Sequence, residues 1–94
     1  MTDVFFDIDE LNNSVMLECI NHSDDYATCM AVSSLCNVLV QEAFRVDKEP
    51  TIYKPGHVRI DLFNISETTR IVFEDVLETF RQLAEQEPEH VRMY

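Results

Sequence analysis

The chain has 94 residues, a length typical of one domain, and its 46% apolar and 27% charged residues exclude an intrinsically disordered chain. Its formal net charge is −11, and residues 1–44 contain eight acidic residues and no basic one. That half lacks the Lys and Arg side chains that contact phosphates, which argues against direct binding of nucleic acid or of an anionic membrane. Two interpretations of the acidic surface stay open, namely solubility alone or attraction of a cationic partner.

Neither a membrane span nor a disulfide framework is expected. The N-terminal residues are acidic and lack the basic region of a signal peptide, and no uninterrupted apolar stretch approaches the ~20 residues of a span. The three cysteines are an odd number without a dense pattern, which favours free thiols in a reducing cytosol. We therefore expect a cytoplasmic protein.

The first half of the chain is predicted to form a hairpin and then a long helix. Residues 4–8 and 15–20 are short β-friendly runs, and the asparagines between them tolerate the positive φ of a hairpin turn. Residues 21–25 offer several N-cap side chains for a helix over about 26–46, which lacks Gly and Pro. One apolar stripe of this helix comprises Cys29, Val32, Leu35, Cys36, Leu39, Ala43 and Val46, and a second face comprises Met30, Ala31, Val38, Val40 and Phe44. A helix with two apolar faces is expected to be covered twice, by the sheet and by a second helix or a second subunit.

The second half is predicted to add strands and another helix. Residues 51–53 favour a short edge strand, residues 54–56 a turn, and the clean alternation over 57–63 a half-buried strand. Ser66 is placed to cap a second helix, and residues 90–94 favour a last strand. The order ββα(β)βαβ predicts an α+β fold, with a mostly antiparallel sheet and two main helices in one domain over residues 1–94.

Cys29 and His22 are the main candidates for chemistry. Cys29 lies near the start of the first predicted helix, where unpaired N–H groups and the helix dipole favour an anion such as a thiolate nucleophile. Asp24 and Asp25 oppose that charge, so activation would rest mainly on a His22 imidazolium, as in thiol proteases. A short loop would fold His22 back, because it lies seven positions before Cys29. The alternative is that Cys29 is a packing residue, the commoner role for a small apolar thiol.

The other two cysteines are predicted to lie in the core. Cys36 is two helical turns from Cys29, about 10.5 Å along the axis, which is too far for a disulfide. Cys19 falls in the second strand. A zinc site made of Cys19, His22 and Cys29 lacks a CxxC pair and a fourth ligand, so neither a metal nor a cofactor is expected.

A resemblance to a known family is carried by the run Cys29-Met30-Ala31-Val32-Ser33-Ser34-Leu35, which follows a strand ending in His22. The run resembles the ribosomal-processing cysteine protease (Prp) family, which has a Gly-His-Ala loop and a helix start of Asp-Ile-Val-Cys-Ala-Ala-Val-Ser-Ala-Leu. The similarity continues at Pro55-Gly56-His57-Val58 and at Gln86-Glu87-Pro88-Glu89-His90-Val91. It spans nearly the whole chain in the same order of elements.

The resemblance implies a cytoplasmic, usually dimeric thiol protease that acts in ribosome biogenesis. Such an enzyme removes a short N-terminal extension from a large-subunit ribosomal protein, and a basic substrate would suit the acidic half of this chain. Carried over, Cys29 is the nucleophile, His22 is the base, and Ser33 matches a supporting serine of the family helix. Asp25 is the second supporting candidate, because it stands one position from the family's aspartate, which is Tyr26 here. The expected oxyanion site is formed by backbone N–H groups at the helix start.

Two hypotheses remain open, because this chain departs from the family between His22 and Cys29. The family's connecting loop is longer and contains glycine, whereas residues 23–28 contain none. The first hypothesis is a Prp-like protease with a Cys–His dyad. The second is a non-catalytic member of the fold that serves as a dimeric binding or scaffold module. A homodimer is expected in both cases, from the two apolar faces of the first helix.

Overall fold

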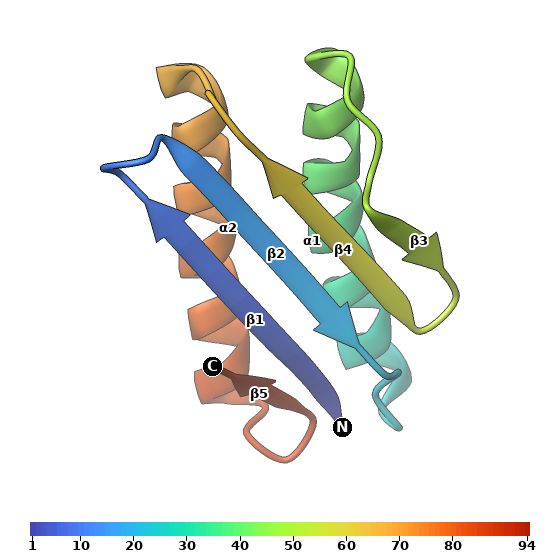
Figure 1. Cartoon of the computed structure of the whole chain (residues 1–94). Coiled ribbons are helices and arrows are strands. Elements are labelled where there is room, and N and C mark those ends of the chain that lie inside the picture. Colours follow the sequence, from blue (N-terminus) through green and yellow to red (C-terminus); the bar gives the residue numbers. More distant parts are fainter.

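The computed structural model describes all residues, 1–94, and consists of a five-stranded sheet with two helices on one face (Figure 1). The elements are β1 (Thr2–Asp9), β2 (Ser14–Ile20), α1 (Tyr26–Arg45), β3 (Ile52–Lys54), β4 (His57–Leu62), α2 (Glu67–Gln86) and β5 (Val91–Met93). The predicted α+β class and the predicted order of elements are therefore confirmed.

The sheet has the strand order β3-β4-β2-β1-β5, and every neighbouring pair is antiparallel except β1 and β5. β2 lies at the centre and pairs with β4 in a register that places Ile20 opposite His57. The residues that follow β2 therefore emerge beside the turn between β3 and β4. This junction is where the candidate site lies.

The hairpin turn and the two helix N-caps are formed by residues that the sequence predicted for these places. Asn13 has a φ of 55° in the hairpin between β1 and β2, as expected for an asparagine in a tight turn. Among the several cap candidates, Asp25 caps α1 and accepts a hydrogen bond from the Thr28 N–H at 2.9 Å. Ser66 caps α2, as predicted.

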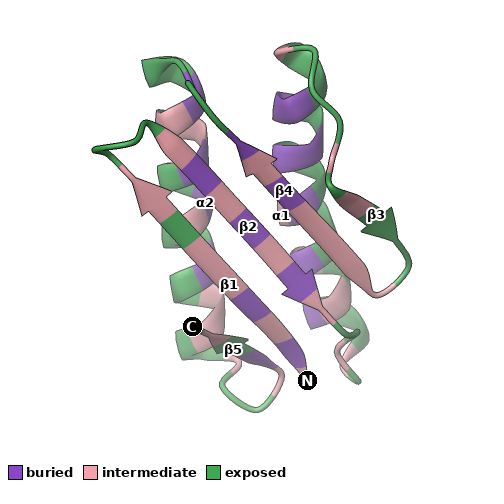
Figure 2. Ribbon diagram, viewed as in Figure 1, coloured by how far each residue is buried: buried purple, intermediate pink, exposed green.

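The hydrophobic core lies between the sheet and the helices. Buried and partly buried residues alternate along β2 and the first half of β1 in Figure 2, because successive side chains of a strand point to opposite faces. The core comprises 16 buried apolar residues, and the two largest, Phe73 and Phe80 of α2, are fully buried. α2 therefore contributes its largest apolar side chains to the interior.

The second apolar face of α1 is only partly covered. The sheet and the flank of α2 contact this helix, and Val40 is buried. Met30, Val38 and Phe44 nevertheless remain 51%, 47% and 45% exposed. Within one chain the expected second cover is thus incomplete, and the homodimer stays a prediction.

α1 is as long as a membrane span, although polar residues interrupt its apolar stretch as the sequence indicated. By length and composition alone, this helix of 20 residues could cross a membrane. Core helices of soluble proteins pass the same test, and α1 packs one face against the core. Some apolar residues of α1 belong to the core, whereas Met30, Val38 and Phe44 are exposed.

A buried carboxylate on α1 links the two helices. Glu42 is 7% exposed, accepts a hydrogen bond from the Thr69 hydroxyl of α2 at 2.8 Å, and contacts the Arg45 guanidinium at 2.7 Å. The hydrogen bonds from Arg45 and then from Thr69 lower the pKa of Glu42. Sequence periodicity did not single out this residue, because a glutamate is expected on the solvent side of a helix.

Replacing Glu42 by alanine is expected to lower the free energy of unfolding by about 2 kcal/mol at neutral pH, since a buried hydrogen-bonded charge is lost. Because the pKa is lowered in the folded state, this stabilisation is complete above the ordinary value of 4.5 and disappears as the pH falls through the folded value. Urea unfolding at a series of pH values measures it. The matched control is Glu78→Ala in an exposed ion pair on α2, with an expected change within about 0.5 kcal/mol. An equal loss in both variants would contradict a specific link.

Candidate active site

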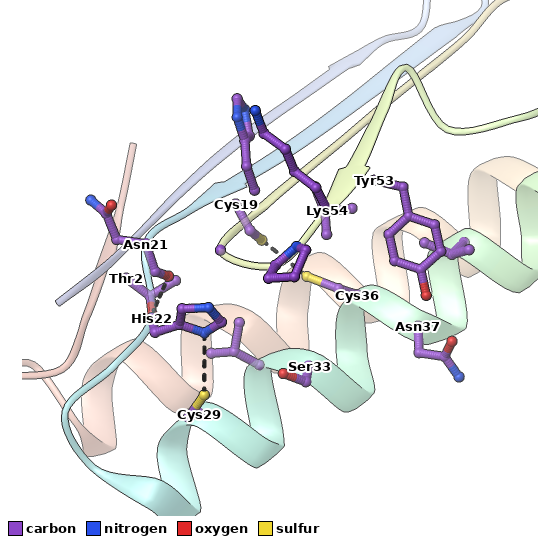
Figure 3. Close-up of a pocket in the computed structure, with 16 residues that line it drawn as sticks. Thr2, Cys19, Asn21, His22, Cys29, Ser33, Cys36, Asn37, Tyr53 and Lys54 are labelled. Atoms are coloured by element: carbon purple, nitrogen blue, oxygen red, sulfur yellow. Dashed lines mark hydrogen bonds between the residues drawn. The ribbon is translucent and has the colours of Figure 1, made fainter.

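A pocket of about 400 Å³ lies between α1, the end of β2 and the hairpin of β3 and β4 (Figure 3). Cys29 and Ser33 contribute from α1, His22 from the segment after β2, and Lys54 and Gly56 from the hairpin. The pocket is therefore built where the β3–β4 hairpin meets the end of β2 and α1, which are near each other in the sequence.

The structure brings His22 and Cys29 together at this pocket. The Nδ1 atom of His22 lies 3.8 Å from the Sγ atom of Cys29, and Figure 3 shows the ring directed at the sulfur. Cys29 is the fourth residue of α1, and the short connection folds His22 back onto the helix start. An imidazole in contact with a thiol can accept its proton and leave a thiolate–imidazolium pair.

The position of the His22 ring depends on Gly56. Gly56 has a φ of +77°, and a Cβ atom built on it would lie 3.2 Å from Nε2 and 3.3 Å from Cδ2 of His22. Its carbonyl also accepts a hydrogen bond from the Asn21 N–H at 2.8 Å, and the Thr2 hydroxyl donates to the Asn21 carbonyl at 3.2 Å. Gly56, Asn21 and Thr2 thus hold the segment that carries His22.

Sequence reasoning missed these three residues. The sequence predicted only that Gly56 lies in a turn, although Gly56 is the single glycine of the chain and follows a proline. The contact with His22 arises from the register of β2 against β4, which the local sequence does not reveal. The uniqueness of Gly56 was the one available signal.

Asp25 supports the helix start but does not contact His22. Its carboxylate accepts hydrogen bonds from the N–H and from the hydroxyl of Thr28, at 2.9 and 2.7 Å. The hydroxyl and then the N–H of Thr28 lower the pKa of Asp25. Ser33, the other supporting candidate, lines the pocket one turn after Cys29 and makes no side-chain hydrogen bond to the dyad. Asp25 therefore fixes the start of α1, while Ser33 is available to a ligand.

Two of the N–H groups expected to form an oxyanion site are already occupied. The Asp25 carboxylate accepts a hydrogen bond from the Thr28 N–H. The Asp25 carbonyl accepts one from the Cys29 N–H at 2.9 Å. The N–H groups of Tyr26 and Ala27 make no backbone or side-chain hydrogen bond. These two are the donors that the helix start leaves free for an anion.

No protein-family model and no curated protein matches the sequence. Solved structures do match. The structure of SMU.848 from Streptococcus mutans has 27% identity and a TM-score of 0.77, over 99% of this chain and 91% of that one. The ribosomal processing protease Prp from S. aureus matches twice. With a covalently linked product peptide it has 17% identity and a TM-score of 0.79, over 99% of this chain and 97% of Prp. The structure of S. aureus Prp with a substrate peptide has 15% identity and a TM-score of 0.80, over 100% of this chain and 98% of Prp.

The chain has the Prp fold. The resemblance found in the sequence is thereby confirmed at the level of the fold. Within this Prp fold, the connection from His22 to Cys29 keeps the two side chains in contact despite its lack of glycine.

The charge of the pocket differs from that of the chain as a whole. None of its 16 lining residues is acidic, and Lys54 is the one lining residue with a permanent charge. Asp24 and Asp25 lie at the helix start, next to the pocket but not in its wall. The acidity of this Prp-fold chain thus lies outside the cavity, where it acts on a ligand at longer range.

The remaining thiols, Cys19 and Cys36, lie buried in the core and also line the pocket. Their core position was predicted, but their mutual contact was not. The Cys36 thiol donates to the Cys19 sulfur at 3.1 Å, and this hydrogen bond together with burial raises the pKa of Cys19. No cluster of His, Cys, Asp and Glu side chains suited to a metal ion is present in this Prp fold.

Proposed function

We propose that this chain is a cytoplasmic thiol protease of the Prp type, which trims the N-terminal extension of a large-subunit ribosomal protein with a Cys29–His22 dyad. The observation that carries the proposal is the 3.8 Å separation of His22 Nδ1 and Cys29 Sγ at the pocket. The shared fold supports it, because S. aureus Prp binds a substrate peptide and a covalently linked product peptide. The proposal needs no metal and no cofactor.

The mechanism begins with transfer of the Cys29 proton to Nδ1 of His22. The thiolate attacks the scissile carbonyl carbon and forms a tetrahedral intermediate, and the free N–H groups of Tyr26 and Ala27 would donate hydrogen bonds to its oxyanion. The His22 imidazolium then gives its proton to the departing amine, and a thioester with Cys29 remains. Water, deprotonated by His22, hydrolyses the thioester and restores the thiol.

The substrate class follows from the charge outside the pocket. Residues 1–44 have a formal charge of −8, and attraction of that surface would accelerate encounter with a basic ribosomal protein. The pocket itself has no acidic wall, so the basic residues of the substrate would lie outside it.

We also propose that the enzyme is a homodimer. The exposed Met30, Val38 and Phe44 of α1 support it, because a second copy would remove these side chains from water. Light scattering at micromolar concentration gives the mass, and a monomer would contradict the dimer.

A specific observation favours the alternative, a non-catalytic dimeric binding module of the same fold. The N–H of Cys29 is bonded to the Asp25 carbonyl, so the nucleophile's own amide is not free for an oxyanion. In that case Cys29 would act in packing, and Cys29→Ala would keep every binding partner and cellular effect.

Alkylation by iodoacetamide separates the two functions. A free cysteine is only a few per cent thiolate at pH 7, so a thiolate–imidazolium pair is expected to raise the rate at Cys29 by about tenfold or more. Cys19 and Cys36 are buried and should react far more slowly. The rate at Cys29, followed by peptide mass spectrometry, should fall in His22→Gln. Equal, slow alkylation of all three thiols would reject the dyad.

A further inference from the structure

The contact between Cys19 and Cys36 is the strongest feature that the proposed protease does not use. Cys19 belongs to β2 and Cys36 to α1, and their Sγ atoms lie 3.1 Å apart. This is closer than the optimum of about 3.5–4.0 Å between packed carbon atoms, whereas a disulfide bond measures about 2.05 Å. Figure 3 shows the two sulfur atoms directed at each other. The thiols are therefore arranged as a pair.

The pair is buried but open to a small reagent. Each cysteine is 5% exposed, yet both line the pocket, so a molecule the size of water or peroxide that enters the pocket meets them without unfolding. Cys29 lines the same pocket but lies about 10.5 Å along the helix axis from Cys36, too far to compete as its partner. The geometry thus pairs Cys36 with Cys19 alone.

We propose that Cys19 and Cys36 are a modification site, which hydrogen peroxide converts into a reversible intramolecular disulfide. One thiol loses its proton and attacks the O–O bond of the peroxide, giving a sulfenic acid and one water. The second thiol attacks the sulfenic sulfur, the S–S bond forms, and the hydroxyl leaves as a second water. The two sulfurs together lose two electrons, and the peroxide is reduced to two water molecules. A dithiol such as dithiothreitol reverses the bond by exchange.

The environment of the pair sets its rate. The hydrogen bond from Cys36 and burial raise the pKa of Cys19, which keeps the thiol protonated and slows the first step. The pair is therefore expected to resist brief exposure to peroxide and to oxidise under sustained exposure. Because thiolate, not thiol, reacts, raising the pH should accelerate the oxidation.

The bond would join the two elements that carry the dyad. His22 follows Cys19 by three residues, and Cys29 precedes Cys36 on α1. A cross-link between residues separated by 17 positions restricts the unfolded chain and holds β2 against α1. The oxidised form is therefore expected to unfold at a higher urea concentration than the reduced form. The disulfide does not depend on the proposed protease, since it uses neither His22 nor Cys29.

The test uses the full chain with Cys29→Ser, which removes the third thiol. The reduced protein is incubated with hydrogen peroxide, and the peroxide is then removed. The protein is unfolded in urea in the presence of iodoacetamide, and its mass is measured by mass spectrometry. We expect the two cysteines to lose one hydrogen atom each and to take up no alkyl group, apart from any oxygen added at methionine, and we expect the digest to contain the Cys19 and Cys36 peptides joined. After dithiothreitol the same protein should take up two alkyl groups.

The matched control is Cys29→Ser with Cys19→Ala, which leaves Cys36 alone and should give no joined peptide. Reduced glutathione in a separate tube, treated with the same peroxide for the same time, shows that the peroxide was active. If the glutathione is consumed while the chain still takes up two alkyl groups, the two thiols are inert core residues and the proposal is wrong. Oxygen addition without a joined peptide, or a disulfide between two chains, would also overturn it.

Discussion

Peptide cleavage is expected to fall by about 10²- to 10⁴-fold when His22 is replaced by glutamine, since this is the usual contribution of a general base. With Cys29→Ala it should fall to background, because no nucleophile remains. The measurement follows, by mass spectrometry, the trimming of a ribosomal protein that carries its N-terminal extension. Both losses rest on the contact between His22 Nδ1 and Cys29 Sγ.

The control for this prediction is Glu78→Ala, which removes an exposed side chain of α2 that does not line the pocket. It should leave cleavage unchanged. If Cys29→Ala trims the substrate as fast as the wild type, the chain is no thiol protease, and the binding module becomes the better account. Unfolding by urea shows whether each variant is intact.

Replacing Gly56 by alanine is expected to lower cleavage by up to about tenfold, because the His22 ring must shift by a few tenths of an ångström and a shift of about 1 Å costs about 10²-fold. The new Cβ atom would lie 3.2 Å from Nε2 of His22, so the ring must move away from its present place. The φ of +77° also strains any residue with a Cβ, by about 1 kcal/mol. The expected signature is a fall in kcat together with slower alkylation of Cys29.

Asn64→Ala is the matched control for backbone strain, since Asn64 also has a positive φ, of 51°, but lies in the loop between β4 and α2. The two variants should lose similar stability, while only Gly56→Ala loses activity. Equal activity in both would show that the His22 ring tolerates displacement and that Gly56 serves the turn alone.

Much of the fold could be predicted because its signals are local. The alternation of apolar residues predicted a strand over 57–63, and β4 spans His57–Leu62. Ser66 correctly predicted the start of α2. The pairing of β5 beside β1 could not be predicted, because the partners stand at opposite ends of the chain. Such pairings depend on tertiary packing rather than on the pattern of either strand.

The candidate site divides in the same way. His22 and Cys29 were predicted from their chemistry and from the resemblance, and a loop of six residues between them limits how far apart they can lie. Gly56 and the contact of Cys19 with Cys36 could not be predicted, because each joins segments whose relative placement is set by the sheet and α1. The free N–H groups at the helix start depend on which of several polar residues becomes the cap.

The segment before β5 supports one residue of the pocket wall, Thr2. The Thr2 hydroxyl donates a hydrogen bond to the Asn21 carbonyl, and the Thr2 N–H donates one to the His90 carbonyl at 2.8 Å. His90 immediately precedes Val91, the residue of β5 that pairs with Thr2. The segment that carries His22 therefore gains its last support only when the final strand has been synthesised and paired. Such contacts between distant residues form late and slowly. Pairing of β5 with β1 is thus expected to precede the final placement of His22 beside Cys29.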